Sequence, residues 1–160
     1  MLRLPPPTED TPTFDEIDRA LSRLDPQAAP RWGEMKAGQM VRHCAAFCDL
    51  YLGRVSVPMP IRAIARMIGP LFLRRVVKGS PTATPKNLKT LPSLRTGSEE
   101  ALDLGAEVEV LRERLRAVGE LEGVVQHVLY GPTEAEAVRT LVRHHTAHHL
   151  NQFGILDPGV

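Results

Sequence analysis

The sequence predicts an all-α fold with four main helices, one extra helix and one long loop. Three observations lead to this prediction. Apolar residues recur at helical spacing in several long segments of the 160-residue chain. Two of these segments open on a Thr-x-x-Glu pattern, at Thr13–Glu16 and Thr133–Glu136, which is the spacing of a helix capping box. Prolines gather in the stretches between segments. We expect a single domain over residues 1–160, with residues 1–12 as an extended N-terminal arm.

The first two helices are predicted from capping and apolar spacing. After the capping box at Thr13, a helix should run from about Phe14 to Leu24, and Pro26 should end it. A second helix should run from about Lys36 to Leu52. Its apolar stripe has a 3-4-3 spacing and includes one histidine. The stripe consists of Met40, His43, Phe47 and Leu50.

The middle of the chain contains a less regular helix and a long loop. Residues Ile61–Val77 are predicted to be helical, with an interruption near Gly69–Pro70. Residues Lys78–Gly97 contain three prolines and are predicted to form a loop. A third long helix should begin at Ser98–Ala101 and run to about Val118.

The last third of the chain is predicted to be helical apart from one connector. Residues Gly119–Tyr130 fit either a short strand or an extended connector. The second capping box, at Thr133, should open a last helix that runs to about Phe153, and Gly154 is a typical helix stop.

Composition excludes several functional classes. Apolar residues make up 42% of the chain, charged residues 24%, and the net charge is +1. This balance gives no reason to expect a nucleic-acid or membrane partner. Residues Val55–Val77 carry four arginines and three prolines, which argues against a membrane span. No export signal is visible, so we expect a cytoplasmic protein. Cys44 and Cys48 are interpreted as small buried apolar residues rather than a disulfide.

The histidines form the main functional pattern. Four of the six lie in the stretch His144–His149 of the last predicted helix. His145 and His149 are four residues apart, which places their Cβ atoms about 5–6 Å apart on one helical face. They continue the apolar stripe of that helix and should point inward. His43 is the inward-facing histidine of the second helix, so we expect His43, His145 and His149 to bind one divalent metal ion.

Two histidines on one helix and one on another give three nitrogen ligands with open positions, as in catalytic metal sites. Imidazole ligands favour zinc, nickel, iron or copper. Gln39 and Gln152 are candidate hydrogen-bond partners of the ligands. Two other interpretations remain open at this point. His43 can be an ordinary buried histidine, and His148 can replace His145 or His149 as a ligand. Burying several histidines without partners costs a few kcal/mol each, which favours a metal.

Residues for catalysis beyond metal binding are not evident. A His-Glu-x-x-His metalloprotease is excluded because Thr146 stands where the glutamate would be needed. His144 and His148 are only weak candidates for a general base. Cys44 adjoins His43 but should point about 100° away around the helix, so it is not expected to act as a nucleophile.

Two motifs resemble a known family. Trp32-Gly33-x-Met35 is followed by Gln39-Met40-Val41-x-His43-Cys44, and His145-x-x-His148-His149-Leu150-x-Gln152-Phe153-Gly154 lies near the C-terminus. Together they resemble the DinB-like superfamily, a group of metal-binding four-helix bundles that includes YfiT-like proteins. The resemblance extends from about Trp32 to Gly154, and the C-terminal motif is its most specific part.

The resemblance implies an up-down-down-up bundle whose long crossover is formed by residues Ile61–Gly97. It implies that His43, His145 and His149 bind nickel, zinc or a related ion, and that the protein is a homodimer. Similar proteins include transferases that add a low-molecular-weight thiol to a small electrophile. Tyr130–Thr133 matches a connector found in the most similar branch, whose activity is not assigned. His127, which precedes it, is interpreted as a surface residue rather than one facing the cavity.

A basic stretch is hidden by the overall charge balance. No Asp or Glu occurs from Leu50 to Ser98, whereas nine Lys or Arg residues do. The stretch can attract an anionic substrate or contact a membrane surface or nucleic acid. A solvated helix face followed by a loop is the simpler interpretation.

The sequence therefore predicts a metal-dependent thiol S-transferase or hydrolase that acts on a small electrophile. The alternative is a non-catalytic protein that binds a metal or a small ligand, expressed in stress. We expect a small-molecule substrate and neither a nucleic-acid nor a membrane partner. A structural bundle held together by its histidines is a third, weaker option.

Overall fold

The fold is mainly α-helical with one small antiparallel sheet. The computed structural model describes residues 1–87 and 102–156. In chain order the elements are α1 (Phe14–Leu21), α2 (Ala37–Tyr51), α3 (Met59–Val77), the short 3-10 helix η1 (Pro81–Ala83), α4 (Leu104–Gly119), β1 (Val124–His127), β2 (Gly131–Glu134) and α5 (Ala135–Gln152). The expectation of a mainly helical protein is confirmed, and the ambiguous segment before the last helix contains a short strand.

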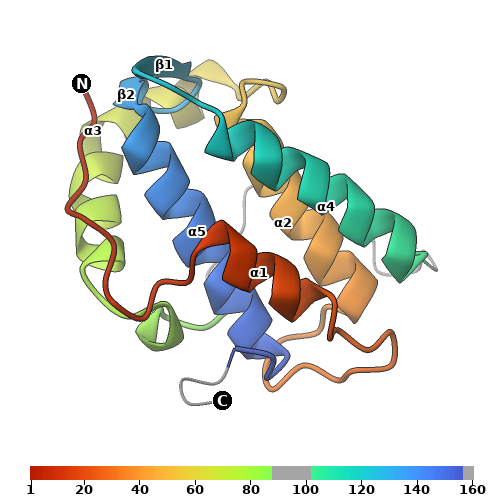
Figure 1. Ribbon diagram of the computed structural model, residues 1–160. Helices are drawn as coiled ribbons and strands as arrows, with labels where there is room; N and C mark the ends of the chain where they lie inside the picture. The colour runs from red at the N-terminus through yellow and green to blue at the C-terminus, as the bar shows by residue number, and fades with distance from the viewer. Residues whose placement is uncertain (88–101, 157–160) are drawn as a thin grey trace.

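Helix α5 is the centre of the structure. It contacts α1, α2, α3, α4, η1 and β2, and α2 packs along α4 beside it (Figure 1). Helix α3 lies on the side of α5 away from α4 (Figure 1). Because helices surround it, most of the α5 surface is buried, including its polar residues. A histidine on almost any face of α5 is therefore inside the protein.

The first capping box forms as the sequence predicts. The Thr13 backbone N–H donates to Glu16 Oε2 at 2.7 Å, and the Glu16 backbone N–H donates to Thr13 Oγ1 at 3.2 Å. Helix α1 ends at Leu21 instead of Leu24, and residues 22–23 form a turn. The helix buries Ile17, Ala20 and Leu21 in the core.

The second capping box does not form, so that prediction was wrong. Thr133 belongs to strand β2, where it pairs with Val125, and its hydroxyl donates to the Gly131 carbonyl. Helix α5 begins at Ala135 after Glu134, whose side chain makes no capping hydrogen bond. The hairpin pairing holds Thr133 in an extended strand that extends to Glu134, so no threonine is left to cap the helix. The predicted stop at Gly154 is confirmed, with φ at +72°.

Two other predicted boundaries differ from the structure. Helix α3 continues through Gly69 and Pro70 without the expected interruption. A proline removes one backbone hydrogen bond, and the packing of the buried residues Leu73 and Val77 beyond it maintains the helix. The predicted helix start at Ser98–Ala101 lies outside the described residues. Helix α4 begins at Leu104, where the Asp103 side chain accepts hydrogen bonds from the next backbone N–H groups.

Much of the predicted loop, residues 88–97, also lies outside the described residues. The N-terminal arm is extended, and Leu2 makes backbone hydrogen bonds to Pro132 and Glu134 beside β2. Both cysteines are free and buried, as expected. In residues 1–87 and 102–156, no helix combines the length and apolar character needed to cross a membrane.

Candidate metal centre

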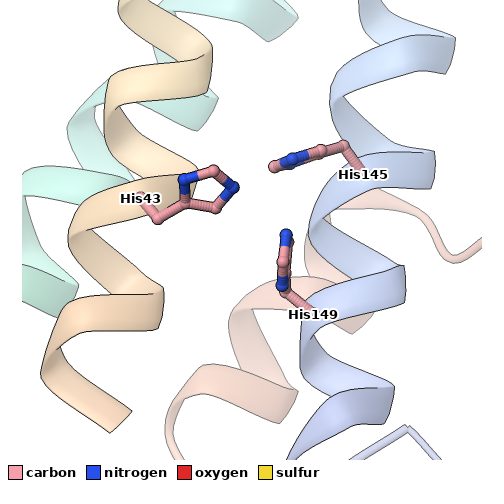
Figure 2. Close-up of side chains that lie close together, drawn as sticks. All are labelled: His43, His145 and His149. Carbon is pink, nitrogen blue, oxygen red and sulfur yellow. The ribbon is translucent and has the colours of Figure 1, made fainter. Parts of the chain in front are cut away.

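Three histidines meet at the interface of α2 and α5. His43 projects from α2, and His145 and His149 project from successive turns of α5 toward it (Figure 2). One ring nitrogen from each lies within 4.8 Å of the other two. The ring centroids are 5.0 Å apart for His43 and His145 and 4.7 Å apart for His43 and His149. This group of three can hold a metal ion, as the sequence predicts.

The local sequence explains why these side chains converge. Met40 and Leu50 bury the same face of α2 that carries His43, and Val138, Leu141 and Val142 anchor α5 on the core. With both helices fixed by these apolar contacts, the four-residue spacing of His145 and His149 aligns them toward His43. The site therefore follows from two ordinary amphipathic faces that meet.

Burial keeps the two candidate ligands on α5, His145 and His149, neutral at physiological pH. Burial and the neighbouring histidines lower the pKa of His149 to about 3 and that of His145 well below its usual value. A neutral imidazole has one nitrogen lone pair available for a metal ion, whereas an imidazolium has none. The electrostatics of the site thus suit metal binding without a preceding loss of protons.

Gln152 orients one of the ligands. His149 Nδ1 lies 2.9 Å from Gln152 Oε1, and Gln152 Nε2 donates to the Trp32 carbonyl at 2.6 Å. Since an amide oxygen only accepts, His149 Nδ1 must carry the hydrogen, which leaves Nε2 free for a metal. The predicted contact between Gln152 and a ligand is confirmed. Gln39 Oε1 accepts the Lys36 backbone N–H at 2.8 Å, and its role beside His43 stays a prediction.

We expect the Gln152→Leu variant to bind zinc about 10–100-fold more weakly, because loss of such an orienting hydrogen bond typically has this effect. Competition with a chromogenic chelator measures the change. Gln126→Leu is the matched control, since Gln126 is exposed on β1 and far along the chain from the ligands. Equal zinc affinity in both variants would show that Gln152 does not orient the site.

His145 is held by an aromatic ring rather than by hydrogen bonds. Its ring stacks on Phe47 with centroids 3.7 Å apart and an interplanar angle of 3°. Its Nδ1 is buried and has no hydrogen-bond partner among the described residues. A buried polar nitrogen without a partner is costly. A metal ion bound to His145 Nδ1 would offset part of the free-energy cost of burying this nitrogen without a partner. The chemistry of the three histidines is therefore suited to holding a metal ion.

The candidate site opens into a cavity of about 600 Å³. Trp32, Phe47, Leu50, Leu73 and Tyr130 are among the residues that line it, together with the three histidines. Structural zinc sites are closed by four protein ligands, whereas three ligands beside a cavity leave room for water or substrate.

The remaining histidines have other roles in the structure. His144 Nε2 lies 2.8 Å from Thr84 Oγ1, and His148 Nδ1 lies 3.3 Å from the Pro81 carbonyl. Both line the cavity, but neither belongs to the group of three whose ligand atoms converge. The structure thus favours His145 and His149 over His148 as ligands.

The interpretation of His127 as a surface residue was wrong, because its side chain is 2% exposed. His127 Nδ1 accepts hydrogen bonds from the backbone N–H groups of Leu129 and Tyr130. It therefore stabilises the turn between β1 and β2. Its ring packs between the rings of Tyr51 and Tyr130, with centroid distances of 4.2 Å and 4.9 Å.

Cys44 is not placed for catalysis. Its side chain is fully buried, and Cys44 Sγ lies 3.8 Å from Met40 Sδ. Burial raises the pKa of the thiol well above its usual value, so the nucleophilic thiolate is not formed at neutral pH. The expectation that Cys44 is no nucleophile agrees with this environment.

Several cavity residues could not be identified from the sequence. Trp32 and Thr84 lie in irregular segments, and Tyr51 and Tyr130 come from separate elements. No periodic pattern links these positions. One interpretation of the basic stretch was that it attracts an anionic substrate. No Lys or Arg is among the described residues that line the cavity, so the stretch supplies no positive charge to the cavity wall. Lys86 lies at its edge, with Nζ 4.5 Å from the centre of the Trp32 ring.

Comparisons with protein-family models, with curated proteins and with solved structures give no match. The function must therefore be argued from the site itself.

Proposed function

We propose that this chain is a metal-dependent enzyme of the DinB-like type, in which His43, His145 and His149 bind one divalent ion, zinc or nickel. The observation that carries this proposal is the convergence of three imidazoles, with ligand atoms within 4.8 Å, beside a cavity of about 600 Å³. The mutual contacts of α1, α2, α4 and α5 support the helical part of this proposal, and the up-down-down-up order is part of what we propose.

The reaction class follows from what such a site supplies. A bound divalent ion lowers the pKa of a coordinated water to about 7 or holds a coordinated thiol as thiolate. The protein's own residues bind and orient the second reactant in the cavity and exclude bulk water from it. We infer a thiol S-transferase or a hydrolase that acts on a small electrophile.

The second candidate is a non-catalytic protein that binds a metal or a small ligand. It is favoured by one observation: no carboxylate is among the three converging groups, and burial keeps both His144 and His148 from acting as strong bases. Burial lowers the pKa of His144 to about 4. A hydrolase would then need the metal-bound water to act without help from these two imidazoles.

The deciding experiment is elemental analysis of protein purified without a histidine tag. We expect about one equivalent of zinc or nickel in the wild type and none in His43→Ala. His148→Ala is the matched control, because His148 lines the same cavity but lies outside the converging group. It should keep its metal. Metal retained by His43→Ala, or absent from reconstituted wild type, would refute the proposed site.

Turnover then separates the two candidates. Wild type loaded with metal is incubated with a thiol and a panel of small electrophiles, and with the electrophiles alone. An enzyme gives product formation that His149→Ala lacks and His148→Ala retains at least in part. A binding protein gives metal content without turnover in any combination.

A further inference from the structure

One face of helix α2 runs the length of the cavity and carries three chemically different groups. His43, Phe47 and Tyr51 are spaced by four residues, so they lie one above another on successive turns. The Phe47 ring packs against both His145 and Tyr51, with centroid distances of 3.7 Å and 4.9 Å. The cavity therefore passes from the metal ligands over an aromatic ring to a tyrosine hydroxyl.

The tyrosine end of the cavity can donate a hydrogen bond. The hydroxyls of Tyr51 and Tyr130 hydrogen-bond each other, and both residues line the cavity. Burial raises the pKa of both phenols, which keeps them protonated. A pair of hydroxyls uses one O–H in its mutual bond, so the second O–H remains available to a ligand.

Charge is nearly absent between the two ends. Among the described residues that line the cavity, Glu34 is the one Asp, Glu, Lys or Arg. An anionic substituent would lose its hydration there, which is costly, and no cation among the described lining residues offsets the loss; Lys86 lies only at the edge, over the Trp32 ring. Trp32, Phe47 and Leu73 instead offer apolar surface to a ring or a short hydrocarbon.

We propose that the cavity takes an uncharged, largely apolar molecule that carries a carbonyl or ether acceptor at the end away from the histidines. The Tyr51–Tyr130 pair binds that acceptor, Phe47 and Trp32 hold the apolar body, and the reacting group faces His43, His145 and His149. The assignment of the reacting end rests on the proposed function, whereas the preference for an uncharged body rests on the cavity alone.

The single tryptophan of the chain, Trp32, allows ligand binding in the cavity to be measured directly. In ¹⁵N-labelled protein, the Trp32 indole N–H gives one isolated NMR cross-peak at the cavity wall. Titration of chelator-treated protein compares acetophenone, ethylbenzene and 4-acetylbenzoate, so that no metal ion attracts the carboxylate. We expect acetophenone to bind about tenfold more tightly than either of the other two. The Tyr51→Phe/Tyr130→Phe double variant, which removes both hydroxyl donors, should lose the acetophenone advantage over ethylbenzene and leave ethylbenzene binding unchanged.

Equal or tighter binding of 4-acetylbenzoate would overturn the preference for uncharged molecules. An unchanged acetophenone advantage in the Tyr51→Phe/Tyr130→Phe double variant would overturn the role of the tyrosine pair. Elemental analysis of the same protein before chelator treatment keeps the two proposals apart. Absence of metal with the expected ranking of probes contradicts the proposed function alone. If the protein contains one equivalent of metal but acetophenone is not the tightest-binding probe, only the proposed cavity ligand is contradicted.

An independent observation concerns the outer face of α3. Six large apolar residues of this helix are exposed, with Met67 and Leu71 at 75% and 72%. The exposed apolar residues are Met59, Ile64, Met67, Ile68, Leu71 and Phe72. Gly69, Leu73 and Val77 bury the opposite face. Contiguous apolar surface on one helix marks an interaction site.

The charges beside this face indicate its partner. Arg66, Arg74, Arg75 and Lys78 are exposed on or just after α3, and no acid occurs from Leu50 to Ser98. A twofold pairing of α3 with α3 of a second copy would bring basic helices together without acids of their own to offset them. An anionic lipid surface offers the complementary charge, and basic side chains can reach its headgroups while the apolar residues enter the interface.

We infer that α3 lies on an anionic membrane surface without crossing it, which differs from the expectation that no membrane partner exists. Flotation with phosphatidylcholine vesicles, with or without 30% phosphatidylglycerol, measures binding. We expect binding to the anionic vesicles, a loss of about tenfold or more in the Met67→Glu/Leu71→Glu double variant, and weakening at high salt. Val124→Glu, at another exposed apolar position, is the control and should bind normally.

Absence of binding to both vesicle types would overturn this inference. So would a wild-type dimer that the double variant converts to a monomer in light scattering, because the face would then be an interface between protein chains. Folding of the double variant is checked by circular dichroism and by its retained metal content, and both should match wild type because the substituted side chains are exposed.

Discussion

Zinc should raise the thermal midpoint of the metal-free wild type by about 8–16 °C when it is present at a thousandfold excess over its dissociation constant. Such an excess stabilises the folded state by about 4 kcal/mol, if the unfolded chain does not bind. For a protein of this size, each kcal/mol shifts the midpoint by about 2–4 °C. The physical reason is that His43 and the α5 pair are brought together only in the folded state. Differential scanning calorimetry with and without zinc measures the shift.

The His43→Ala variant should lose this shift, because two ligands on one helix no longer tie α5 to α2. His148→Ala should retain it, since His148 is outside the converging group. If His43→Ala and wild type responded equally to zinc, the stabilising ion would be bound elsewhere. The comparison uses shifts within each variant, so differences in their metal-free stability do not affect it.

Metal-free protein should unfold when the pH falls from 7 to 4. Burial lowers the pKa of His127 and of His144 to about 4 each, and that of His149 to about 3. In the unfolded chain these groups titrate near 6.5. The unfolded chain therefore binds more protons over this range, and the free energy of unfolding falls as the pH falls. Stability is fully present above about pH 6.5.

The size of this loss is large compared with the stability of a typical domain. His127 and His144 should each contribute a loss of about 3 kcal/mol between pH 7 and pH 4. Domains of this kind are stable by about 5–15 kcal/mol in total. Urea denaturation at several pH values, in the presence of a chelator, measures the change. An unfolding free energy that stayed level from pH 7 to pH 4 would contradict the prediction.

A single substitution isolates one of these groups away from the candidate metal ligands. In His127→Gln, the amide oxygen can accept the backbone N–H groups of Leu129 and Tyr130 in place of the imidazole nitrogen. It does not titrate in this range. This variant should lose about 3 kcal/mol less than wild type between pH 7 and pH 4. Equal pH dependence in both proteins would show that His127 does not contribute.

The sequence by itself predicted the main helices and placed His43, His145 and His149 on their inward faces. Both predictions follow from periodicity, because residues three and four apart share a face of any helix, whatever surrounds it. The choice of His145 and His149 over His148 came from the structure. The capping box at Thr13 and the stop at Gly154 are equally local and were predicted correctly. The Thr133 box failed for a different reason. Its hydrogen bonds were taken by pairing with β1, a contact that helix-capping rules do not include.

Only the tertiary structure decided what surrounds the histidines. His127 is buried because the rings of Tyr51 and Tyr130 cover it, and they come from separate parts of the chain. The stacking of Phe47 on His145 depends on the packing of α2 against α5. The apolar cavity and the exposed face of α3 likewise depend on which surfaces the helices leave uncovered. Periodicity places a side chain on a face of its helix, but burial depends on the neighbours that meet that face.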